Sequence, residues 1–319
     1  MNGLVQLLRF GRGLRHLPIE YPTADQLSLR LTFRDVHGIA TDVTHDHVPV
    51  SLKPLIIGLN LKQSDAMGTP SPTEGHLDIL DDRDPPRPLA SIHLKSCGSL
   101  LLASGTLSLF ETVGCSNRCA TARVRWFRYA LAWRQARTAK QQGDKLCMRA
   151  RDLRCLNAYY TIPRPVFLVG IVNGTQENLF PMDLVGQISS GAYLLALRAT
   201  SPANQAIRES RRVAMSAAPS DRLQAVHALG AHHHKAAVNL DDLPFALRRS
   251  DLYGLPSLAG TSFVRELMLV AAHNIGSHVL YECHVERESG EARHQLAHVS
   301  AMFAEWRDRT QQPFVEVQP

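Results

Sequence analysis

The side chains with the clearest potential for chemistry are four consecutive residues in the second half of the chain. His232, His233 and His234 are adjacent, and Lys235 follows them. Three neighbouring imidazoles on a regular helix cannot easily point at one metal ion, so metal binding is the least favoured interpretation. Their place just after Gly230, where a helical pattern ends, suits cations at the negative end of a helix dipole. Contact with an anionic ligand is the second interpretation.

Other histidine and cysteine side chains that could ligate a metal ion lack the spacing of known metal sites. His45 and His47 alternate along an expected strand, which puts both imidazoles on one face, but no third ligand is evident. Cys115 and Cys119 are farther apart than the tight pairs of zinc sites, so buried thiols are favoured. The sequence has no G-x-S-x-G elbow, no Walker-type phosphate loop and no H-E-x-x-H. We therefore expect no metal site and no conventional catalytic dyad.

Length and composition limit the class of protein. The chain has 319 residues, of which 45% are hydrophobic and 20% charged, which is typical of one large or two ordinary globular domains. Six cysteines are too sparse for a disulfide scaffold, so a reduced, cytoplasmic protein is expected. No uncharged apolar run reaches the roughly 18 residues of a membrane span. Arg9, Arg12 and Arg15 interrupt the N-terminal apolar stretch, which makes it a poor secretory signal.

The basic charge is concentrated in one segment. From Arg118 to Arg154 there are eleven Lys and Arg against Asp144 and Asp152. Residues 121–142 contain no Pro or Gly and predict a helix, with an aromatic and alanine stripe at helical spacing: Trp126, Tyr129, Ala130, Trp133 and Ala136.

Two interpretations of this helix remain. The favoured one packs the aromatic stripe on the protein and leaves the arginines in water. In the other, the arginine face docks on RNA, acidic lipid or a phosphate. Because the favoured packing leaves no aromatic ring free to stack on a base, nucleic acid is not expected as a partner.

The remaining pattern is mainly β. Strand-like stretches occupy 27–33, 38–44 and 53–61, a Pro-, Gly- and acid-rich loop with one short strand follows at 64–89, and a hairpin spans 91–110. A second, shorter helix is expected over 144–160. Pro163 and Pro165 end the helical pattern, so we divide the chain into domains at 1–157 and 158–319. No internal repeat is visible in the sequence.

The second half predicts a small barrel rather than a doubly wound sheet. Strands are expected over 165–173, 184–199, 213–218 and 262–286, with helices from Ser201 and over 221–234, and a closing helix over 297–312. Asn173-Gly174 is a strong hairpin signal. Ser201 can cap its helix, with Pro202 at the first helical position. There is no alternation of strand and helix that would indicate a parallel sheet.

Residues 160–285 resemble the flavin reductase-like family, the FMN-binding split β-barrels. The resemblance lies in four stretches in the family's order: RPVFLVGIVNGTQENLFPMD from Arg164, VGQISSGAYLLALRATSPANQAIRESRRVAMS from Val185, ALGAHHHKAA from Ala228 and NIGSHVLYECHVE from Asn274. It implies a mainly β fold with some α, in which a C-terminal split barrel follows a β-rich N-terminal domain and the basic helices. The first 157 residues show no such resemblance.

The resemblance also implies which residues contact FMN. In chain order, ring and ribityl contacts come from Asn178, Phe180, Pro181, Met182 and Asp183; strand backbone along the ring from Gln187, Ile188, Ser189 and Ser190; phosphate contacts from Arg198, Thr200, Ser201 and Asn204; a further contact from Lys235; and a catalytic-side histidine from His278. Other interpretations stay open: a tight turn near residue 181, a simple helix cap at Ser201 and an ordinary strand histidine at 278.

The function that follows from the resemblance is an NAD(P)H-dependent flavin reductase. FMN would lie at a barrel–dimer interface of a homodimer, accept hydride from NADH or NADPH, and pass electrons to free flavin, oxygen or a partner oxygenase. A second hypothesis is a flavoprotein of the same fold with another redox task. The third is a non-catalytic binding or interaction protein that docks a partner through residues 116–157.

Overall fold

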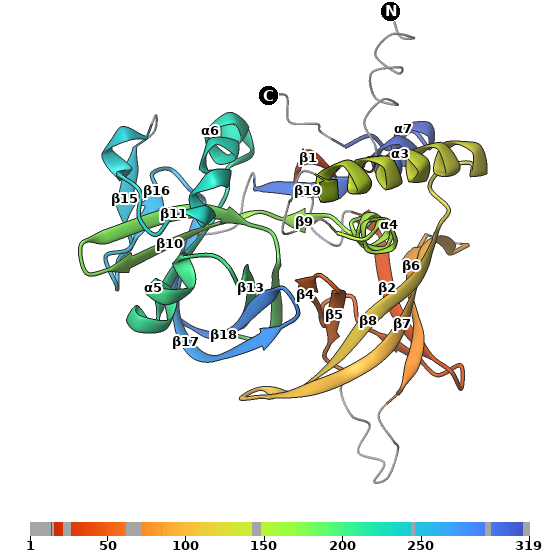
Figure 1. Cartoon of the computed structure of the whole chain (residues 1–319), viewed down its shortest axis with the longest axis horizontal. Coiled ribbons are helices and arrows are strands. Elements are labelled where there is room, and N and C mark those ends of the chain that lie inside the picture. Colours follow the sequence, from red (N-terminus) through yellow and green to blue (C-terminus); the bar gives the residue numbers. More distant parts are fainter. Residues whose placement is uncertain are drawn as a thin grey trace, which may run out of the picture.

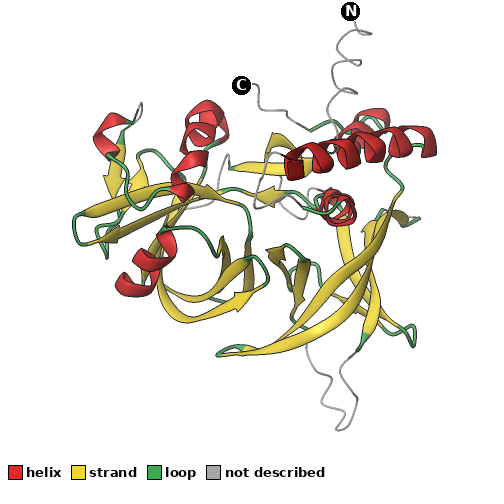
Figure 2. Cartoon of the chain, viewed as in Figure 1, coloured by secondary structure: helices red, strands yellow, loops and turns green. Residues whose placement is uncertain are grey.

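The structure is a computed structural model that describes residues 14, 16–21, 27–61, 72–83, 85–141, 148–243, 246–290 and 295–314. The N-terminal segment with Arg9, Arg12 and Arg15, and residues 62–71 of the expected loop, lie outside the described residues. Figure 2 shows two strand-rich lobes with helices around them.

The first lobe is built on a seven-stranded antiparallel sheet, here called the first sheet. Its strands, in spatial order, are β3 (Ala40–Asp42), β2 (Leu29–Asp35), β6 (Glu74–Asp81), β7 (Arg87–Leu102), β8 (Gly105–Asn117), β5 (Leu55–Leu59) and β4 (His47–Leu52). Apolar residues alternate along these strands, and their inner face forms one core with Phe33, Ile57 and Phe110. This lobe occupies the orange and yellow side of Figure 1.

The second lobe holds another seven-stranded antiparallel sheet, here called the second sheet. In spatial order it contains β11 (Gln176–Met182), β10 (Phe167–Asn173), β14 (Arg212–Ala217), β17 (Phe263–Ile275), β18 (His278–Gly290), β13 (Ala192–Arg198) and β12 (Val185–Ser189). The predicted hairpin at Asn173-Gly174 joins β10 to β11. All its neighbouring strands run antiparallel, so the prediction against a parallel doubly wound sheet is confirmed for the described residues.

The two sheets have the same topology. When the seven strands of each sheet are numbered along the chain, the spatial order in both is 2-1-5-6-7-4-3. In each sheet the long sixth and seventh strands form a hairpin: β7 with β8 in the first and β17 with β18 in the second. The fold is therefore duplicated within one chain, although the sequence shows no repeat. A shared pattern of alternation and turns can keep a topology without keeping residue identities.

The two sheets pack against each other through a common apolar cluster, here called the shared core. From the first sheet it takes Val48, Val50, Ile56, Leu102, Leu107 and Leu109; the second half contributes Leu184, Ile188, Ala192, Leu194, Ala196, Ile275 and Leu280. The closest approach is at Gly186, where an added Cβ would lie 2.6 Å from Cβ of Val48. Only glycine lets these two backbones come so close.

Each sheet core also takes one helix, but from different places in the chain. Helix α4 (Ala150–Tyr159) buries Cys155 and Tyr159 in the first core, whereas α5 (Ala203–Ser210) buries Ala206 and Ile207 in the second. The remaining described elements around the second sheet are η1 (Ser220–Arg222), α6 (Leu223–Ala228), η2 (Leu229–His234), η3 (Leu240–Asp242), β15 (Leu247–Arg249) and β16 (Pro256–Leu258).

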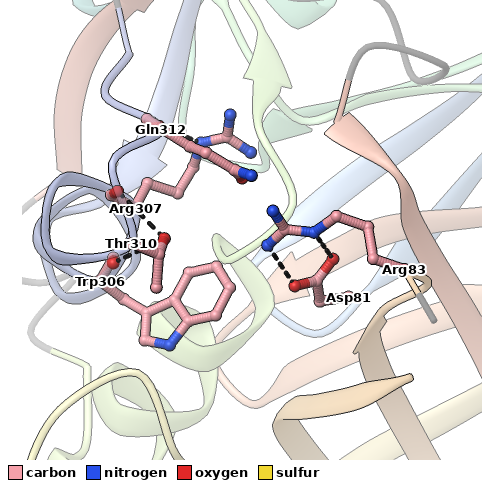
Figure 3. A network of polar contacts seen from close by, with 6 residues as sticks. All are labelled: Asp81, Arg83, Trp306, Arg307, Thr310 and Gln312. Carbon is pink, nitrogen blue, oxygen red and sulfur yellow. Dashed lines mark hydrogen bonds and ion pairs between the residues drawn. The ribbon is translucent and has the colours of Figure 1, made fainter. Parts of the chain in front are cut away.

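The two ends of the described chain meet over the first half. Strand β1 (His16–Glu20) pairs with β19 (Leu296–Ser300), which also pairs with β9 (Arg164–Pro165). Helix α7 (Ala301–Arg309) follows β19 at once, so the closing helix begins later than expected. Figure 3 shows α7 beside the first sheet: Arg83 pairs with Asp81 and its guanidinium lies 5.9 Å from the Trp306 ring centre. The C-terminal helix thus packs on the first half rather than on the second.

Helix α3 (Ala122–Gln141) forms where the sequence predicts a helix, but its orientation differs from the expectation. The predicted burial of the stripe is wrong for Trp126 and Trp133, which are 73% and 55% exposed, whereas Tyr129 packs against the core near Phe303. Arg128 is buried instead, at 1% exposure, and forms an ion pair with Glu305 of α7. This contact joins residues far apart in the chain, and a pattern within one helix cannot reveal it.

None of the helices among the described residues has the length and apolar character needed to cross a membrane.

The internal pairing predicts that the protein is a monomer. The apolar faces of the two sheets already cover each other within one chain through the shared core, so they are not available to a second copy. Light scattering coupled to size-exclusion chromatography should give the 35.3 kDa of one chain across a wide range of concentration. A stable species of about twice this mass would contradict the expectation, and would support the homodimer that the resemblance implies.

Candidate functional site

A cavity of about 610 Å³ lies between the two halves, and we call it the interhalf cavity. Its walls come from both halves: Tyr21, Leu27, Leu29, Leu31, Thr44, His45, Asp46 and His47 on one side, and Ile162, Pro163, Arg164, Pro165, Phe167, Val185, Gly186, Gln187, Ile188, Ser189, Tyr193, Phe263, Arg265 and Gln295 on the other. This volume is within the range of sites for cofactors and drug-sized ligands.

One wall of the interhalf cavity is a sheet edge. Strand β12 is the last strand of the second sheet and pairs only with β13 within it. An edge strand leaves backbone N–H and C=O groups without ladder partners. The Asn60 amide donates to the Ile188 carbonyl at 3.1 Å, so the first half satisfies part of this edge. The other walls are mainly aliphatic and aromatic, including Leu29, Phe167 and Phe263.

Arg164 places a buried guanidinium in the wall, since this residue is only 4% exposed. It donates to the Val185 carbonyl and to the Tyr159 hydroxyl, and it lies 5.6 Å from the Tyr159 ring centre. Its Nε atom is buried without a hydrogen bond. Among the described residues no carboxylate forms an ion pair with it. Buried charges are normally paired, so this cation lacks the anion that would offset its desolvation.

Two further basic residues line the cavity and differ from Arg164 in their surroundings. Arg265 also lines the cavity, but its Nε atom pairs with Glu288 at 2.7 Å and its guanidinium lies 5.1 Å from the Tyr193 ring centre. His45 is exposed at the rim. One carboxylate, that of Asp46, is among the lining residues.

His47 is buried in the wall in a neutral form. Burial, with the nearby positive charge of Arg164, lowers its pKa to about 3, against a weaker opposing effect of the Val43 backbone. Neither ring nitrogen has a hydrogen bond of ordinary geometry. The ring meets Tyr159 edge-on, with 5.5 Å between ring centres. A ligand able to hydrogen-bond with this imidazole would satisfy a polar group that is otherwise unpaired.

Three of the residues implied to contact FMN line the interhalf cavity: Gln187, Ile188 and Ser189. The Gln187 side chain accepts a hydrogen bond from the Tyr193 hydroxyl at 3.0 Å and donates to the Ser189 carbonyl. Ile188 is also part of the shared core. Ser190 is exposed in the turn that follows.

The residues that the resemblance assigns to the phosphate lie outside the cavity wall. We call Arg198, Thr200, Ser201 and Asn204 the loop cluster. Helix α5 begins at Ala203, later than expected, and Ser201 does not cap it. Instead the Ser201 hydroxyl donates to the His233 carbonyl at 2.5 Å. The Asn204 amide donates to three carbonyls, including that of Arg198 at 2.8 Å. These polar side chains are therefore committed to the chain's own backbone.

The His232–Lys235 segment closes over this cluster. The Asn178 amide donates to the carbonyls of His232 at 3.0 Å and Lys235 at 2.8 Å. The imidazole Nδ1 of His232 lies 3.0 Å from the Leu179 carbonyl, while Thr200 and Lys235 are exposed. A phosphate could reach the Ser201 hydroxyl only if this segment moved.

The rest of the implied ring contacts do not form one surface. Phe180 and Met182 are buried in the core of the second sheet, and Pro181 is half-buried between them. Asp183 accepts hydrogen bonds from His298 at 2.8 Å and Tyr160 at 2.9 Å. Burial opposes ionisation of Asp183, but these two donors lower its pKa to about 2. The carboxylate therefore joins β19, through His298, to the end of α4, through Tyr160.

His278 lies at the contact between the two halves, not in the cavity wall. It is 1% exposed, and burial with nearby Arg198 lowers its pKa to about 4. Its Nδ1 atom is 2.9 Å from the Ser277 hydroxyl, which also accepts from the Lys53 backbone N–H of the first half at 3.0 Å. A neutral histidine at a packed contact fits the interpretation of an ordinary strand residue.

Sequence reasoning missed Arg164 and the whole contribution of the first half. Arg164 is the first residue of the stretch RPVFLVGIVNGTQENLFPMD, but no role in binding was predicted for its side chain. Its position between Pro163 and Pro165 was the available signal, because two prolines fix the backbone around a side chain that must be held in place. His47 was considered only as a metal ligand, but in the structure it lies in the cavity wall against Tyr159. Among the described residues, no group of side chains could hold a metal ion.

The comparisons with known proteins concern the fold. No family model matches the chain, and no curated protein matches it. Solved structures similar to it include an FMN-binding protein from Thermus thermophilus, with 22% identity over 42% of this chain and 75% of that one and a TM-score of 0.37. Another is an NADH:FAD oxidoreductase from Streptomyces globisporus, with 18% identity over 44% and 82% and a TM-score of 0.40.

A third similar structure is BorF, the flavin reductase component of a bacterial two-component tryptophan halogenase. It is 15% identical over 47% of this chain and 98% of that one, with a TM-score of 0.40. Flavin reductases and FMN-binding proteins are the group that the sequence resemblance names. At these scores the similarities carry no conclusion about activity, which has to come from the geometry of this chain.

Two of the buried histidines, His47 and His278, predict how stability depends on pH. The pKa values of His47 and His278, about 3 and 4, lie below the 6.5 of an exposed histidine, so the unfolded chain binds these protons first. Their contribution is complete above pH 6.5 and is lost as the pH falls toward 4 for His278 and toward 3 for His47. The limiting slope is about 1.4 kcal/mol per pH unit for each histidine.

Urea unfolding at several pH values measures this slope. His47→Gln should make the free energy of unfolding less steep between pH 6.5 and 4, whereas His37→Gln, at an exposed position, should leave the slope unchanged. Equal slopes for the wild type and His47→Gln would show that burial does not hold His47 neutral.

Proposed function

We propose that this protein is a flavin-binding oxidoreductase that holds its flavin in the interhalf cavity. The observation that carries the proposal is Arg164, a buried guanidinium without a paired carboxylate among the described residues, in the wall of a cavity bounded by both sheets. A flavin nucleotide combines a flat aromatic ring with an anionic phosphate. The cavity offers apolar walls and a buried cation for these two parts.

The residues present fit such a group. Leu29, Phe167 and Phe263 supply apolar surface for ring faces, and the edge of β12 supplies backbone hydrogen-bonding groups. Arg164 and His47 lie in the wall and carry buried nitrogen atoms without a hydrogen bond. When bound, a flavin would supply hydride acceptance, and the protein's part would be binding, orientation and electrostatics.

The finer proposal is a flavin reductase that uses NADH or NADPH. It is supported by the resemblance of residues 160–285 and by the edge strand Gln187–Ser189, which the resemblance assigns to the flavin and which lines the cavity. BorF belongs to a two-component system by its own description. We extend this to the present chain as a proposal: electrons would pass to free flavin, oxygen or a partner oxygenase.

A non-catalytic flavin-fold binding protein is the second candidate. Two observations favour it: His278 is packed between the halves, and the Ser201 hydroxyl is committed to His233. If the protein binds FMN but its visible absorbance does not bleach with NADH or NADPH under anaerobic conditions, this candidate replaces the reductase.

Flavin titration with a matched pair of variants tests the site. Ser189 lines the cavity, whereas neighbouring Ser190 is exposed outside it. Ser189→Phe should fill part of the cavity and weaken FMN binding at least tenfold, measured by quenching of flavin fluorescence, while Ser190→Phe should bind like the wild type.

A third variant separates the two candidate locations. Ser201→Asp puts a negative charge in the loop cluster and should leave FMN affinity unchanged if the flavin lies in the interhalf cavity. Loss of binding in Ser201→Asp with normal binding in Ser189→Phe would move the site to the loop cluster. The absence of FMN binding to the wild-type chain would end the proposal.

A further inference from the structure

Helix α3 presents an aromatic and cationic face to solvent. Trp126, Phe127 and Trp133 are 73%, 44% and 55% exposed. The exposed residues of this face, here called the α3 face, are Arg123, Trp126, Phe127, Ala130, Trp133, Arg134 and Arg137. Large aromatic side chains are seldom left in water without a role, and three on one helix face indicate a binding surface.

The opposite side of α3 anchors the helix, so the α3 face is held in one orientation. Arg128 pairs with Glu305 of α7, Ala132 is 1% exposed, and Arg125 donates to the Asn117 carbonyl. Figure 1 shows α3 along the outside of the molecule, next to α7. The aromatic side chains are therefore exposed because the helix is fixed by its polar side.

Helix α3 carries only positive charge, which favours an anionic binding partner. Its 20 residues include no Asp or Glu, but they include Arg123, Arg125, Arg128, Arg134, Arg137 and Lys140. The Arg137 guanidinium lies 5.4 Å from the Trp133 ring centre, so a cation and an aromatic face already adjoin. A polyanion that also carries flat aromatic groups would match both features.

The order of residues around the helix separates a nucleic acid from a membrane surface. At 100° per residue, the α3 face runs Trp133, Trp126, Arg137, Ala130, Arg123, Arg134 and Phe127. The arginines thus lie between the tryptophans and the phenylalanine, not on the flanks. Inserting these rings into a bilayer would carry the guanidinium groups toward the acyl chains, whereas a nucleic acid strand offers phosphates next to bases.

We propose that the α3 face binds single-stranded nucleic acid, with bases stacked on Trp126 and Trp133 and phosphates on Arg123, Arg134 and Arg137. This inference does not depend on the flavin proposal. The reason for not expecting nucleic acid as a partner was that the aromatic stripe would be buried, and the structure removes that reason. Such stacking is tolerant of sequence, so no particular base order is required.

The test uses the full chain and fluorescein-labelled 15-nucleotide oligo-U and oligo-dT. We expect an increase in anisotropy with both, with log K falling against log salt by about 0.7 for each phosphate contacted. Trp126→Ala with Trp133→Ala should weaken binding at least tenfold. The matched control is Leu101→Ala with Leu252→Ala, which removes exposed apolar side chains elsewhere and should change nothing.

Two double variants that remove arginines test the contribution of charge. Arg123→Gln with Arg134→Gln should lower both the affinity and the salt slope, whereas Arg87→Gln with Arg222→Gln, at exposed positions outside α3, should not. Quenching of tryptophan fluorescence by oligo-U gives a readout on the unmodified protein, since two of its three tryptophans are on the α3 face.

Three results would overturn the proposal. One is the absence of oligonucleotide binding at 50 mM salt. Another is binding that the tryptophan variants do not weaken, which would show charge attraction alone. The third is sedimentation with phosphatidylserine vesicles in the absence of oligonucleotide binding, which would assign the α3 face to a membrane surface. None of these outcomes bears on flavin binding, which is measured separately.

Discussion

The constraint on which the structure depends is that each sheet has an apolar outer face that the other sheet covers. Val48, Leu107 and their neighbours on the first sheet meet Leu194, Leu280 and their neighbours on the second. One chain therefore packs two sheets of the same topology against each other. The interhalf cavity, the setting of His278 and the close approach at Gly186 all follow from this packing.

The two proposed activities lie on different parts of this frame. The interhalf cavity is bounded by both halves and has a buried cation in its wall, so it suits a small ligand with apolar and anionic parts. The α3 face is convex and exposed, with aromatic rings and guanidinium groups side by side, so it suits an extended polyanion. Arg128 and Glu305 connect α3 to α7, and α7 follows the strand that pairs with β9, where Arg164 begins the cavity wall. The same framework therefore supports both surfaces.

The sequence predicted helices, strands and turns better than it predicted which side chains these elements bury. Helix α3, the hairpin at Asn173-Gly174 and the β12 segment at Gln187–Ser189 were found from local patterns, because turn chemistry and periodicity are local. The duplication could not be found, since the two halves share topology without visible repeats. The burial of Arg128 rather than Trp126 depends on a residue 177 positions away. The unpaired state of Arg164 likewise depends on which carboxylates the fold brings near it, and spacing in one chain does not reveal that.

A crystal structure of the protein with FMN tests the central claim most directly. We expect density for the flavin between the two sheets, with its anionic part against the Arg164 guanidinium and its ring beside β12. Density for FMN beside Ser201, with the His232–Lys235 segment displaced, would contradict this account.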